Sequence, residues 1–498
     1  MNQKPNIIYI LGDDHRADHL GCAGHPILKT PNLDQLAKDG VRFSHAFCTS
    51  PGCTPSRACH YTGLWERTHG VNFNSGSSLS LEHWHESFPM VLKRAGYFLG
   101  WVGKDHVPVG DGGGSGQLET DFDYWYGNYG HTGFYPKDLF EDGGLYRSSE
   151  KDTQVELFAE AVADFLSPSE RFRENAVEPF PVRPPDDPFC LCVTFNLPHV
   201  TGIETMQQRE DDDDLYKSAY RDKAHLFKPP ESFVSYDDSR KNPKLPPDLY
   251  SGVYLKCYDF VKDAESLVEQ QIRSCQVVEG MDRFVGQLRQ QLETLGLADN
   301  TIIIFSTDHG LHFGEHGIGG KCFLYEEDIR IPLIIYDPRQ DKDKAGQVRD
   351  EIIAAPDLAS TVLDLCGQDI PSCMQGLSLK PLLDGLSIDW RDELFTEQLM
   401  DIQNYPRHES VRTKDMKYIR YFARAEDPEQ EGNDFRSTLD NYQDFLHASL
   451  NGEEPVYEEL FDLKNDPHEM HNLATDPAYA GALNHLRKRL LVLGKEVL

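Results

Sequence analysis

The stretch that organises the predicted fold is NIIYILGDD, residues 6–14. Its apolar and largely β-branched run predicts a buried strand, and this strand ends in two aspartates. A second stretch of the same design, TIIIFS at residues 301–306, ends in Thr-Asp-His-Gly at 307–310. Ligands of open α/β sheets bind beyond the carboxyl ends of the strands. We therefore expect both polar ends to meet in one site.

Strand and helix patterns alternate along the chain around these two stretches. Further buried strands are predicted at residues 97–103, 189–196 and 331–336, and helices at 32–39, 88–95, 152–166, 254–296 and 478–496. The alternation predicts an α/β fold, with a large, mostly parallel sheet sandwiched by helices. After residue 385 the segments become shorter and more polar. We therefore predict a main domain over residues 1–385 and a smaller C-terminal α+β subdomain over residues 386–498.

The composition excludes several classes of partner. The chain has 498 residues, with 49 Lys and Arg against 82 Asp and Glu, a net charge of −33. Such an acidic surface repels phosphate backbones and anionic lipids, so we expect neither nucleic acid nor a membrane among the partners. No apolar run of the sequence approaches the ~18 residues that cross a bilayer.

The first residues and the cysteines indicate a cellular location. No basic and apolar segment of the signal-peptide type precedes Asn6, which predicts a cytoplasmic protein. If a signal peptide has been removed, the location is periplasmic. The eleven cysteines are an odd number without regular spacing, so we expect most of them to be free and buried.

The segment richest in chemistry is CTPSRACHYTG, residues 53–63. It places Cys53 at the entry to a predicted helix, with Pro55 at an early helical position and Arg57 one turn later. Helix N-termini attract anions, and a guanidinium matches a sulfuryl or phosphoryl group. A buried cysteine in a helix cap explains a lone cysteine equally well, but the neighbouring residues favour an anion site.

These residues resemble the Cys-x-Pro-Ser-Arg and downstream Thr-Gly motif of the type I sulfatases, which have an alkaline-phosphatase-like fold. Other blocks resemble the family in the same order, at residues 13–14, 103–106, 198–199, 307–310, 314–321, 375–379 and 459–474. The resemblance covers nearly the whole chain. Two inserted stretches, residues 108–150 and 200–250, have no counterpart that we can name.

The resemblance implies a nucleophile and a cofactor. Cys53 would be oxidised by a formylglycine-generating enzyme to formylglycine, whose hydrated aldehyde attacks sulfur. A sulfated diol then collapses and expels sulfate, whereas a thiol adduct has no such exit. The resemblance also implies a divalent cation, for which we expect Ca²⁺, held by Asp13, Asp14, Asp308 and His309. The family more often has Asn in the fourth position, and imidazole suits transition metals better.

The resemblance also assigns roles around the sulfate. Arg57 would stabilise the hydrated aldehyde, Lys104 would bind it together with sulfate, and His106 would take the proton that triggers sulfate elimination. The family commonly has Trp at the position of Asp105, so the wall of the pocket is expected to differ here. Asp308 would accept a proton from the diol.

Two further residues are expected at the ester oxygen. Lys321 and His199 would face it, with His199 as the general acid that protonates the leaving alcohol. Since a polyanionic substrate must approach an acidic protein, we expect a local basic funnel formed by Arg57, Lys104, Lys321 and Arg330.

Other motifs compete with this interpretation. Residues 312–316 fit the H-x-x-E-H zinc-protease pattern, but that pattern needs a helix and the nearby glycines predict a loop. The glycine-rich stretch 110–116 lacks the spacing of a phosphate-binding loop and is read as a lid or plain loop. Cys190 and Cys192 face the same way on a strand, which favours packing over a metal pair.

Aromatic residues gather in the first inserted stretch. They are Tyr124, Trp125, Tyr126, Tyr129 and Tyr135. These side chains either stack on sugar rings near the site or form the core under a long loop, and the sequence leaves both possibilities open.

The predicted function is a sulfuric ester hydrolase that removes sulfate from a sulfated oligosaccharide or polysaccharide. A phosphonate or phosphate ester hydrolase of the same superfamily shares the nucleophile and the metal and is the nearest alternative. A sulfated-glycan binding protein whose cysteine is never converted is the third, although binding alone needs neither a nucleophile nor an acid.

Overall fold

The core of the computed structural model is an eight-stranded sheet in the order β12-β2-β11-β7-β1-β6-β4-β5. The structure describes residues 4–72, 77–111, 114–174, 176, 180–202, 206–246, 249, 262–399, 405–423 and 436–498. The strands are β1 (Asn6–Asp13), β2 (Val41–Phe43), β4 (Phe98–Lys104), β5 (Tyr124–Asn128), β6 (Phe189–Pro198), β7 (Thr301–Thr307), β11 (Ile334–Tyr336) and β12 (Gln347–Arg349). Only β11 runs antiparallel to its neighbours, so the predicted mostly parallel sheet is confirmed for the described strands.

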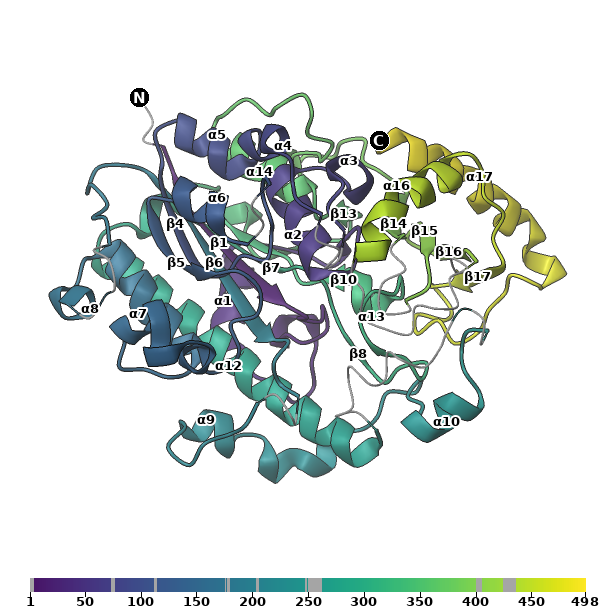
Figure 1. Cartoon of the computed structure of the whole chain (residues 1–498), viewed down its shortest axis with the longest axis horizontal. Coiled ribbons are helices and arrows are strands. Elements are labelled where there is room, and N and C mark those ends of the chain that lie inside the picture. The colour runs from purple at the N-terminus through teal and green to yellow at the C-terminus, as the bar shows by residue number, and fades with distance from the viewer. Residues whose placement is uncertain are drawn as a thin grey trace.

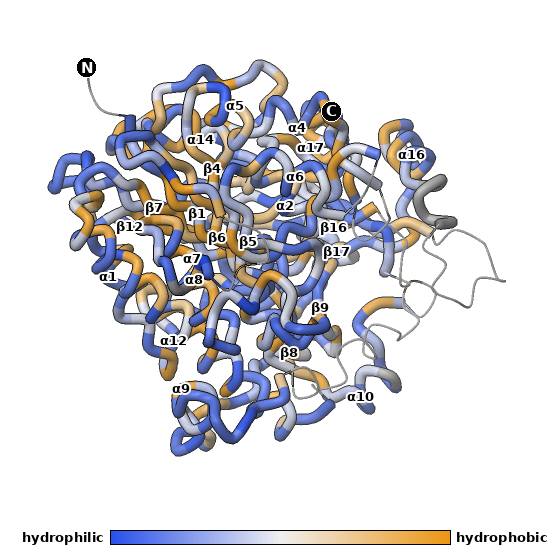
Figure 2. Tube along the Cα trace, turned by 60° about the vertical axis from the view of Figure 1, so that its left-hand side comes forward, coloured by the Kyte–Doolittle hydropathy of each residue, from blue (hydrophilic) through white to orange (hydrophobic). Residues whose placement is uncertain are grey.

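Apolar side chains on both faces of β1 explain why it lies at the centre of the sheet. Ile7, Tyr9 and Leu11 belong to the hydrophobic core on one face, and Ile8 and Ile10 belong to the core on the other. Figure 2 shows β1, β6 and β7 as an apolar centre. A strand buried on both faces needs helices above and below it, as predicted.

Helices cover each face of the sheet (Figure 1). One face carries α1 (Pro31–Asp39), α7 (Gln154–Leu166) and α12 (Ala264–Thr294), and the other carries α2 (Cys53–Thr62), α5 (Phe88–Arg94) and α14 (Asp357–Leu365). The helix predicted over 254–296 is α12, whose N-cap Asp263 accepts hydrogen bonds from the first helical turn. Residues 254–261 of that prediction lie outside the described residues.

One predicted strand is wrong. Residues 331–336 form two short strands, β10 (Arg330–Ile331) and β11 (Ile334–Tyr336), in different sheets. Pro332 lies between them, and proline has no N–H to continue a ladder. Strand β10 pairs instead with β3 (Ala46–Phe47).

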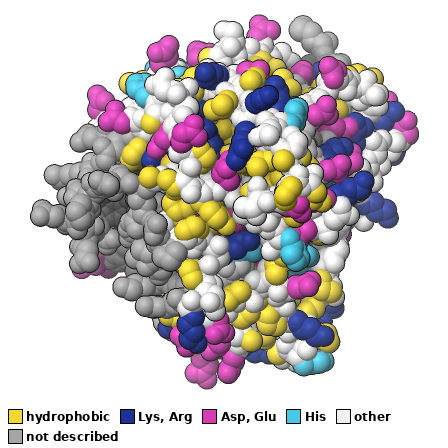
Figure 3. Space-filling view, turned by 90° about the vertical axis from the view of Figure 1, so that its right-hand side faces the viewer, with side chains coloured by type: hydrophobic (Ala, Val, Ile, Leu, Met, Phe, Trp, Pro, Cys, Tyr) yellow, Lys and Arg dark blue, Asp and Glu magenta, His cyan; other side chains and the backbone are white. Residues whose placement is uncertain are grey.

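A second, antiparallel sheet is formed by the C-terminal region, as the α+β prediction requires. It consists of β14 (Leu394–Gln398), β15 (His408–Arg412), β16 (Met416–Tyr421) and β17 (Tyr457–Asp462), accompanied by α16 (Arg436–Leu450) and α17 (Ala480–Glu496). A domain boundary at residue 385 stays a prediction. Acidic, basic and apolar side chains are interspersed on this side of the molecule (Figure 3).

The described ranges bear on two predictions, about membrane-spanning helices and about free cysteines. None of the helices there combines the length and apolar character needed to cross a membrane. The ten cysteines in the described ranges are free, and all except Cys373 are buried or half-buried.

Candidate active site

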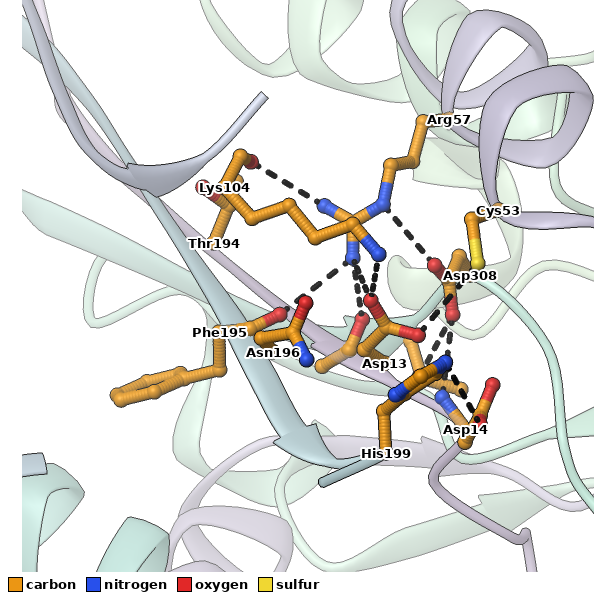
Figure 4. A network of polar contacts seen from close by, with 12 residues as sticks. Asp13, Asp14, Cys53, Arg57, Lys104, Thr194, Phe195, Asn196, His199 and Asp308 are labelled. Carbon is orange, nitrogen blue, oxygen red and sulfur yellow. Dashed lines mark hydrogen bonds and ion pairs between the residues drawn. The ribbon is translucent and has the colours of Figure 1, made fainter. Parts of the chain in front are cut away.

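The predicted site residues lie where parallel strands end. Asp13 and Lys104 are the last residues of β1 and β4, His199 follows β6, and Asp308 and His309 follow β7. Since these strands are neighbours in the sheet, their carboxyl ends meet at one edge. Figure 4 shows Asp13, Lys104, His199 and Asp308 around a common centre.

Helix α2 delivers the cysteine to this edge. Cys53 is the first residue of α2, so its backbone is at the positive end of the helix dipole. Its Sγ lies 2.9 Å from Lys321 Nζ and 3.7 Å from Asp13 Oδ1. Burial raises the pKa of the Cys53 thiol, as does Asp13, but the charges of Lys104 and Lys321 outweigh them and the pKa is lowered.

Arg57 ties the acidic strand ends together. Its fully buried guanidinium donates from Nε to Asp308 Oδ2 at 2.9 Å and from Nη2 to Asp13 Oδ2 at 3.2 Å. Lys104 Nζ contacts the same Asp13 oxygen. Burial alone would raise the pKa of Asp13, yet the charges of Lys104 and Arg57 hold it well below its usual range. Asp13 is therefore an ionised carboxylate in a buried site.

Four side chains form a group whose donor atoms suit a divalent cation. Ligand atoms of Asp13, Asp14, Cys53 and His309 lie within 4.8 Å of one another. Asp14 Oδ2 and His309 Nε2 are buried without a hydrogen-bond partner, which leaves a carboxylate oxygen and an imidazole nitrogen for an ion. The structure thus brings together three of the four predicted ligands and adds Cys53, which the sequence analysis did not place among them.

Asp308, the fourth predicted ligand, is occupied by hydrogen bonds. Its Oδ2 accepts from Arg57 Nε, and its Oδ1 accepts from the backbone N–H of His309 at 2.9 Å. Asp14 adopts a left-handed backbone conformation, φ 63°, of the kind that collects at functional sites. Lys321 Nζ donates a hydrogen bond to Asp14 Oδ1 at 3.0 Å. Lys321 therefore bridges Asp14 and Cys53, and its predicted role at the ester oxygen stays a prediction.

Two predicted histidines stand at the rim. His199 Nε2 lies 3.8 Å from Asp14 Oδ2, and its side chain is 21% exposed. His106 is nearly buried. Burial lowers the pKa of both rings well below the usual range, and Lys104 lowers the pKa of His106 further, as Lys321 does for His199. Both imidazoles are neutral at pH 7, so each has one N–H and one lone pair.

A third histidine at the rim was missed by the sequence analysis. The ring of His131 lies 4.6 Å from that of His199 and 5.6 Å from that of His106. His131 Nδ1 is 3.1 Å from Asn196 Oδ1, at the end of β6. It belongs to the inserted stretch 108–150, where the only sequence signal is a histidine among glycines and aromatics.

The aromatic residues of that stretch divide between core and rim. Tyr124, Tyr126 and Tyr135 are buried, as expected for a core under a long loop. Tyr129 is 42% exposed, and its ring lies 5.5 Å from that of His106. Of the five aromatic residues singled out in the sequence, Tyr129 is therefore the one that is exposed and contacts a predicted site residue.

The remaining predictions have mixed outcomes. Asp105 is buried beside the site, and burial is the main cause that raises its pKa to about 7. Arg330, in β10, donates to the backbone carbonyl of Ser44, and no contact among the described residues links it to the expected basic funnel. Residues 312–316 do not form a helix, as expected from the glycines.

Two other motifs of the sequence are the Cys190–Cys192 pair and the glycine-rich stretch 110–116. Cys190 and Cys192 are buried in the sheet, in the same apolar core as expected for packing residues. The glycine-rich stretch 110–116 includes residues 112–113, which lie outside the described residues.

Comparisons with known proteins agree with this geometry. The sulfatase family model matches residues 5–368, and the model of the N-sulphoglucosamine sulphohydrolase C-terminal region matches residues 314–443. The N-acetylglucosamine-6-O-sulfatase of Bacteroides thetaiotaomicron is 27% identical, with 98% of this chain and 86% of that protein covered.

Solved structures share the same architecture. A protein in complex with its substrate D-glucosamine-2-N,6-O-disulfate has a TM-score of 0.67 and 25% identity over 99% of this chain and 98% of the other. The phosphonate monoester hydrolase of Agrobacterium radiobacter has a TM-score of 0.67 and 21% identity over 99% and 96% of the two chains, which shows the shared fold. The chain therefore belongs to the sulfatase family: it is a sulfuric ester hydrolase with an alkaline-phosphatase-like fold.

Proposed function

We propose that this enzyme removes sulfate from a sulfated carbohydrate by means of a formylglycine made from Cys53. The observation that carries the proposal is the place of Cys53, at the start of α2 with Lys321 Nζ 2.9 Å from its Sγ and two carboxylates beside it. The relatives named above act on N-acetylglucosamine-6-sulfate and glucosamine disulfate, so sulfated amino sugars are the first substrates to test.

Formylglycine supplies a hydrated aldehyde oxygen as nucleophile, and a divalent cation, for which we propose Ca²⁺, supplies positive charge beside it. Asp13, Asp14 and His309 would hold the cation, with Asp308 beside them. Arg57 keeps Asp13 and Asp308 in place, because its buried guanidinium hydrogen-bonds both.

The lysines and histidines would act on the substrate. Lys104 and Lys321 carry positive charge at the centre of the site, where sulfate oxygens would bind. His199, at the rim, is the proposed general acid: its imidazolium form, which the negative charge of a bound sulfate ester would favour, would protonate the leaving alcohol and return to the neutral ring. Neutral His106 would accept the proton that accompanies sulfate release. The ring of His131 lies at a tilt against that of His199 and would position that ring and the sugar attached to the leaving oxygen.

The maturation step has a physical requirement. Cys53 is 1% exposed in the folded chain, so a formylglycine-generating enzyme would have to act before α2 packs against the sheet. That enzyme is therefore a proposed partner of the nascent chain.

The first test is the mass of the peptide that contains Cys53, after expression with a formylglycine-generating enzyme. We expect the mass of the aldehyde or its hydrate, together with sulfate release from 6-O-sulfated and N-sulfated glucosamine oligosaccharides. Cys53→Ala is the matched control without a nucleophile. An unmodified thiol with no sulfate release would reject the proposal. A higher kcat/KM for phosphonate monoesters than for matched sulfate esters would make phosphonate hydrolysis the main activity.

A further inference from the structure

Polar atoms without a partner surround His131 at the rim of the site. His131 shares a hydrogen bond with Asn196, and its ring lies 5.6 Å from that of His106 and 4.6 Å from that of His199. In each of these three neighbours one buried atom has no hydrogen-bond partner: Asn196 Nδ2, His106 Nδ1 and His199 Nδ1. Buried polar atoms are almost always paired in a folded protein. The unpaired atoms around His131 therefore indicate a place where a polar ligand binds.

The side chain of Asn196 is only partly used. It is fully buried near the end of β6, three residues before His199 (Figure 4). Its Oδ1 lies 3.1 Å from His131 Nδ1, and its Nδ2 has no partner. A carbonyl oxygen only accepts hydrogen bonds, so Nδ1 of His131 must carry the proton. Asn196 thus selects one of the two neutral forms of His131.

The loop that carries His131 is fixed to the same strand. Gln154, the first residue of α7, is fully buried. Its Oε1 accepts from the backbone N–H of Asn196 at 2.8 Å, and its Nε2 donates to Thr132 Oγ1 at 2.6 Å and to the carbonyl of Gly133. One buried side chain therefore holds both Asn196 and the two residues after His131. The fold itself sets the contact between His131 and Asn196.

His131 presents a free nitrogen to the solvent. The positive charge of Lys104 lowers the pKa of His131, so at pH 7 the ring is neutral, with one N–H and one lone pair. With the proton on Nδ1, the lone pair is on Nε2. The side chain is exposed, and none of the residues that the structure describes donates to this nitrogen. A substrate at the rim therefore meets a hydrogen-bond acceptor.

We propose that Asn196 is a positioning residue of this sulfatase: it holds His131 with the proton on Nδ1, so that Nε2 accepts a hydrogen bond from a hydroxyl of the substrate sugar. The inference rests on the proposed activity toward sulfated carbohydrates. A hydroxyl can donate to Nε2, whereas a carboxylate or a second O-sulfate cannot. Because His131 adjoins His199, the proposed acid at the ester oxygen, the rim selects a sugar with a free hydroxyl close to the sulfate ester.

The opposite orientation of the Asn196 amide would reverse this selection. If Nδ2 faced His131, it would donate to Nδ1, and the proton of the ring would be on Nε2. His131 would then offer a donor to the substrate, which suits a carboxylate or a second sulfate. The two orientations therefore differ in the tautomer of His131 and in the sugar that is preferred.

Nitrogen NMR of the full-length protein, labelled with ¹⁵N in its histidine rings, measures the tautomer directly. Nε2 couples to both ring C–H protons and Nδ1 to one, so the coupling pattern identifies each nitrogen. The signals of His131 are those lost in His131→Gln. We expect a protonated Nδ1 and an unprotonated Nε2.

Two leucine variants show what holds the tautomer. Asn196→Leu has nearly the same shape without the carbonyl, and it should shift His131 toward the form with the proton on Nε2. Asn300→Leu is the matched control. Asn300 directly precedes β7, at the edge of the sheet opposite the site, so this variant should leave the His131 signals unchanged.

Kinetics on paired substrates test the hydrogen bond to the sugar. For 6-O-sulfo-N-acetylglucosamine, Asn196→Leu should lower kcat/KM about fivefold, and for a small aryl sulfate it should lower kcat/KM less than about twofold. The 3-O-methyl and 4-O-methyl ethers of the sugar each lack one hydroxyl donor. The wild type should lose about fivefold on one of them, and Asn196→Leu should lose nothing further on that ether, because the same hydrogen bond is already absent.

The spectroscopic and kinetic results fail in different ways. A proton on Nε2 of wild-type His131 would overturn the proposal even where Asn196→Leu does not fold, and so would an unchanged tautomer in folded Asn196→Leu. Equal losses on every substrate would overturn it too, because they would indicate a structural role only. No sulfate release from any sulfated sugar by the wild type would reject the proposed function and the sugar as ligand, while the tautomer would still decide whether Asn196 holds His131.

Discussion

Two buried charged groups in this molecule share their residue types but differ in how their atoms are used. One is the active-site group of Asp13, Asp14, Arg57 and His309. The other, the Arg67 cluster, consists of Arg67, Glu397, Glu409 and Arg420 and joins α3 (Glu66–His69) to the C-terminal sheet.

The carboxylates of the Arg67 cluster are saturated. Both oxygens of Glu397 accept from Arg67, and the two oxygens of Glu409 accept from Arg67 Nη2 at 3.1 Å and Arg420 Nη2 at 2.6 Å. In the active site, by contrast, Asp14 Oδ2 and His309 Nε2 have no partner. A closed set of hydrogen bonds stabilises a fold, whereas an open set leaves positions for an ion and a substrate.

The largest expected effect is on catalysis and separates the two groups most sharply. Cys53→Ala should lower kcat at least about 10⁴-fold, because it removes the proposed nucleophile, while the free energy of unfolding changes by less than about 1 kcal/mol. Sulfate release and denaturant unfolding measure the two quantities. Residual turnover within tenfold of the wild type would mean that another group attacks sulfur.

The second effect is on stability. Arg67→Met should lower the free energy of unfolding by about 3–5 kcal/mol, since it leaves Glu397 and Glu409 buried without their cation. The kcat of the folded fraction should stay within a few-fold of the wild type. Arg94→Met, which breaks the exposed pair with Glu86, is the matched control and should cost less than about 1 kcal/mol. An equal, small loss of unfolding free energy in both variants would contradict the structural role of the Arg67 cluster.

The third effect is a pH dependence in the C-terminal sheet. Burial lowers the pKa of His408 to about 4, although Pro406 and Glu409 oppose the shift. Between pH 6.5 and 4 the unfolded chain therefore binds a proton that the folded chain refuses, and stability falls as the pH falls. His408→Phe, which keeps an aromatic ring on Tyr421, should lose up to about 3 kcal/mol less than the wild type over this range. Parallel stability–pH curves for the two proteins would show that His408 does not titrate as described.

The smallest effect is at the rim of the open group. His131→Ala should lower kcat/KM for a sulfated oligosaccharide about tenfold, because the ring beside His199 is lost. A small aryl sulfate, which does not extend past the rim, should be affected less. Tyr135→Phe, in the same inserted stretch but buried and bonded to Asp212, is the control and should leave kcat/KM unchanged. If aryl sulfate and oligosaccharide lose activity equally, His131 acts on the chemistry and not on the sugar.

The strand ends were predictable because their signal is local. Apolar runs ending in Asp13 and in Asp308 define buried strands, and parallel strands bring their carboxyl ends to one edge whatever lies between them. The start of a helix at Cys53 was predictable for the same reason, because the proline and the arginine that indicate it follow within about one helical turn. Pro332 is a local signal that a strand over residues 331–336 is interrupted. The apolar sequence on either side of it does not indicate which sheet each half joins.

His131 and the Arg67 cluster were not predictable. His131 meets His199 across a loop whose path depends on packing, and Glu397 is 330 residues away from Arg67 along the chain. Nothing in the local sequence separates a saturated carboxylate from one with a free oxygen, because the partners come from other strands.

The sequence by itself therefore determined the α/β architecture, the place of the Cys53 segment at a helix start and the acidic strand ends, since each depends on residues close together in the chain. Only the tertiary structure decided which side chains share their hydrogen bonds. Asp308 is occupied by Arg57, and Cys53 lies with Asp13, Asp14 and His309 in the group of metal-ligating atoms. Those outcomes depend on distances between atoms that the fold brings together, and such distances have no local signature in the sequence.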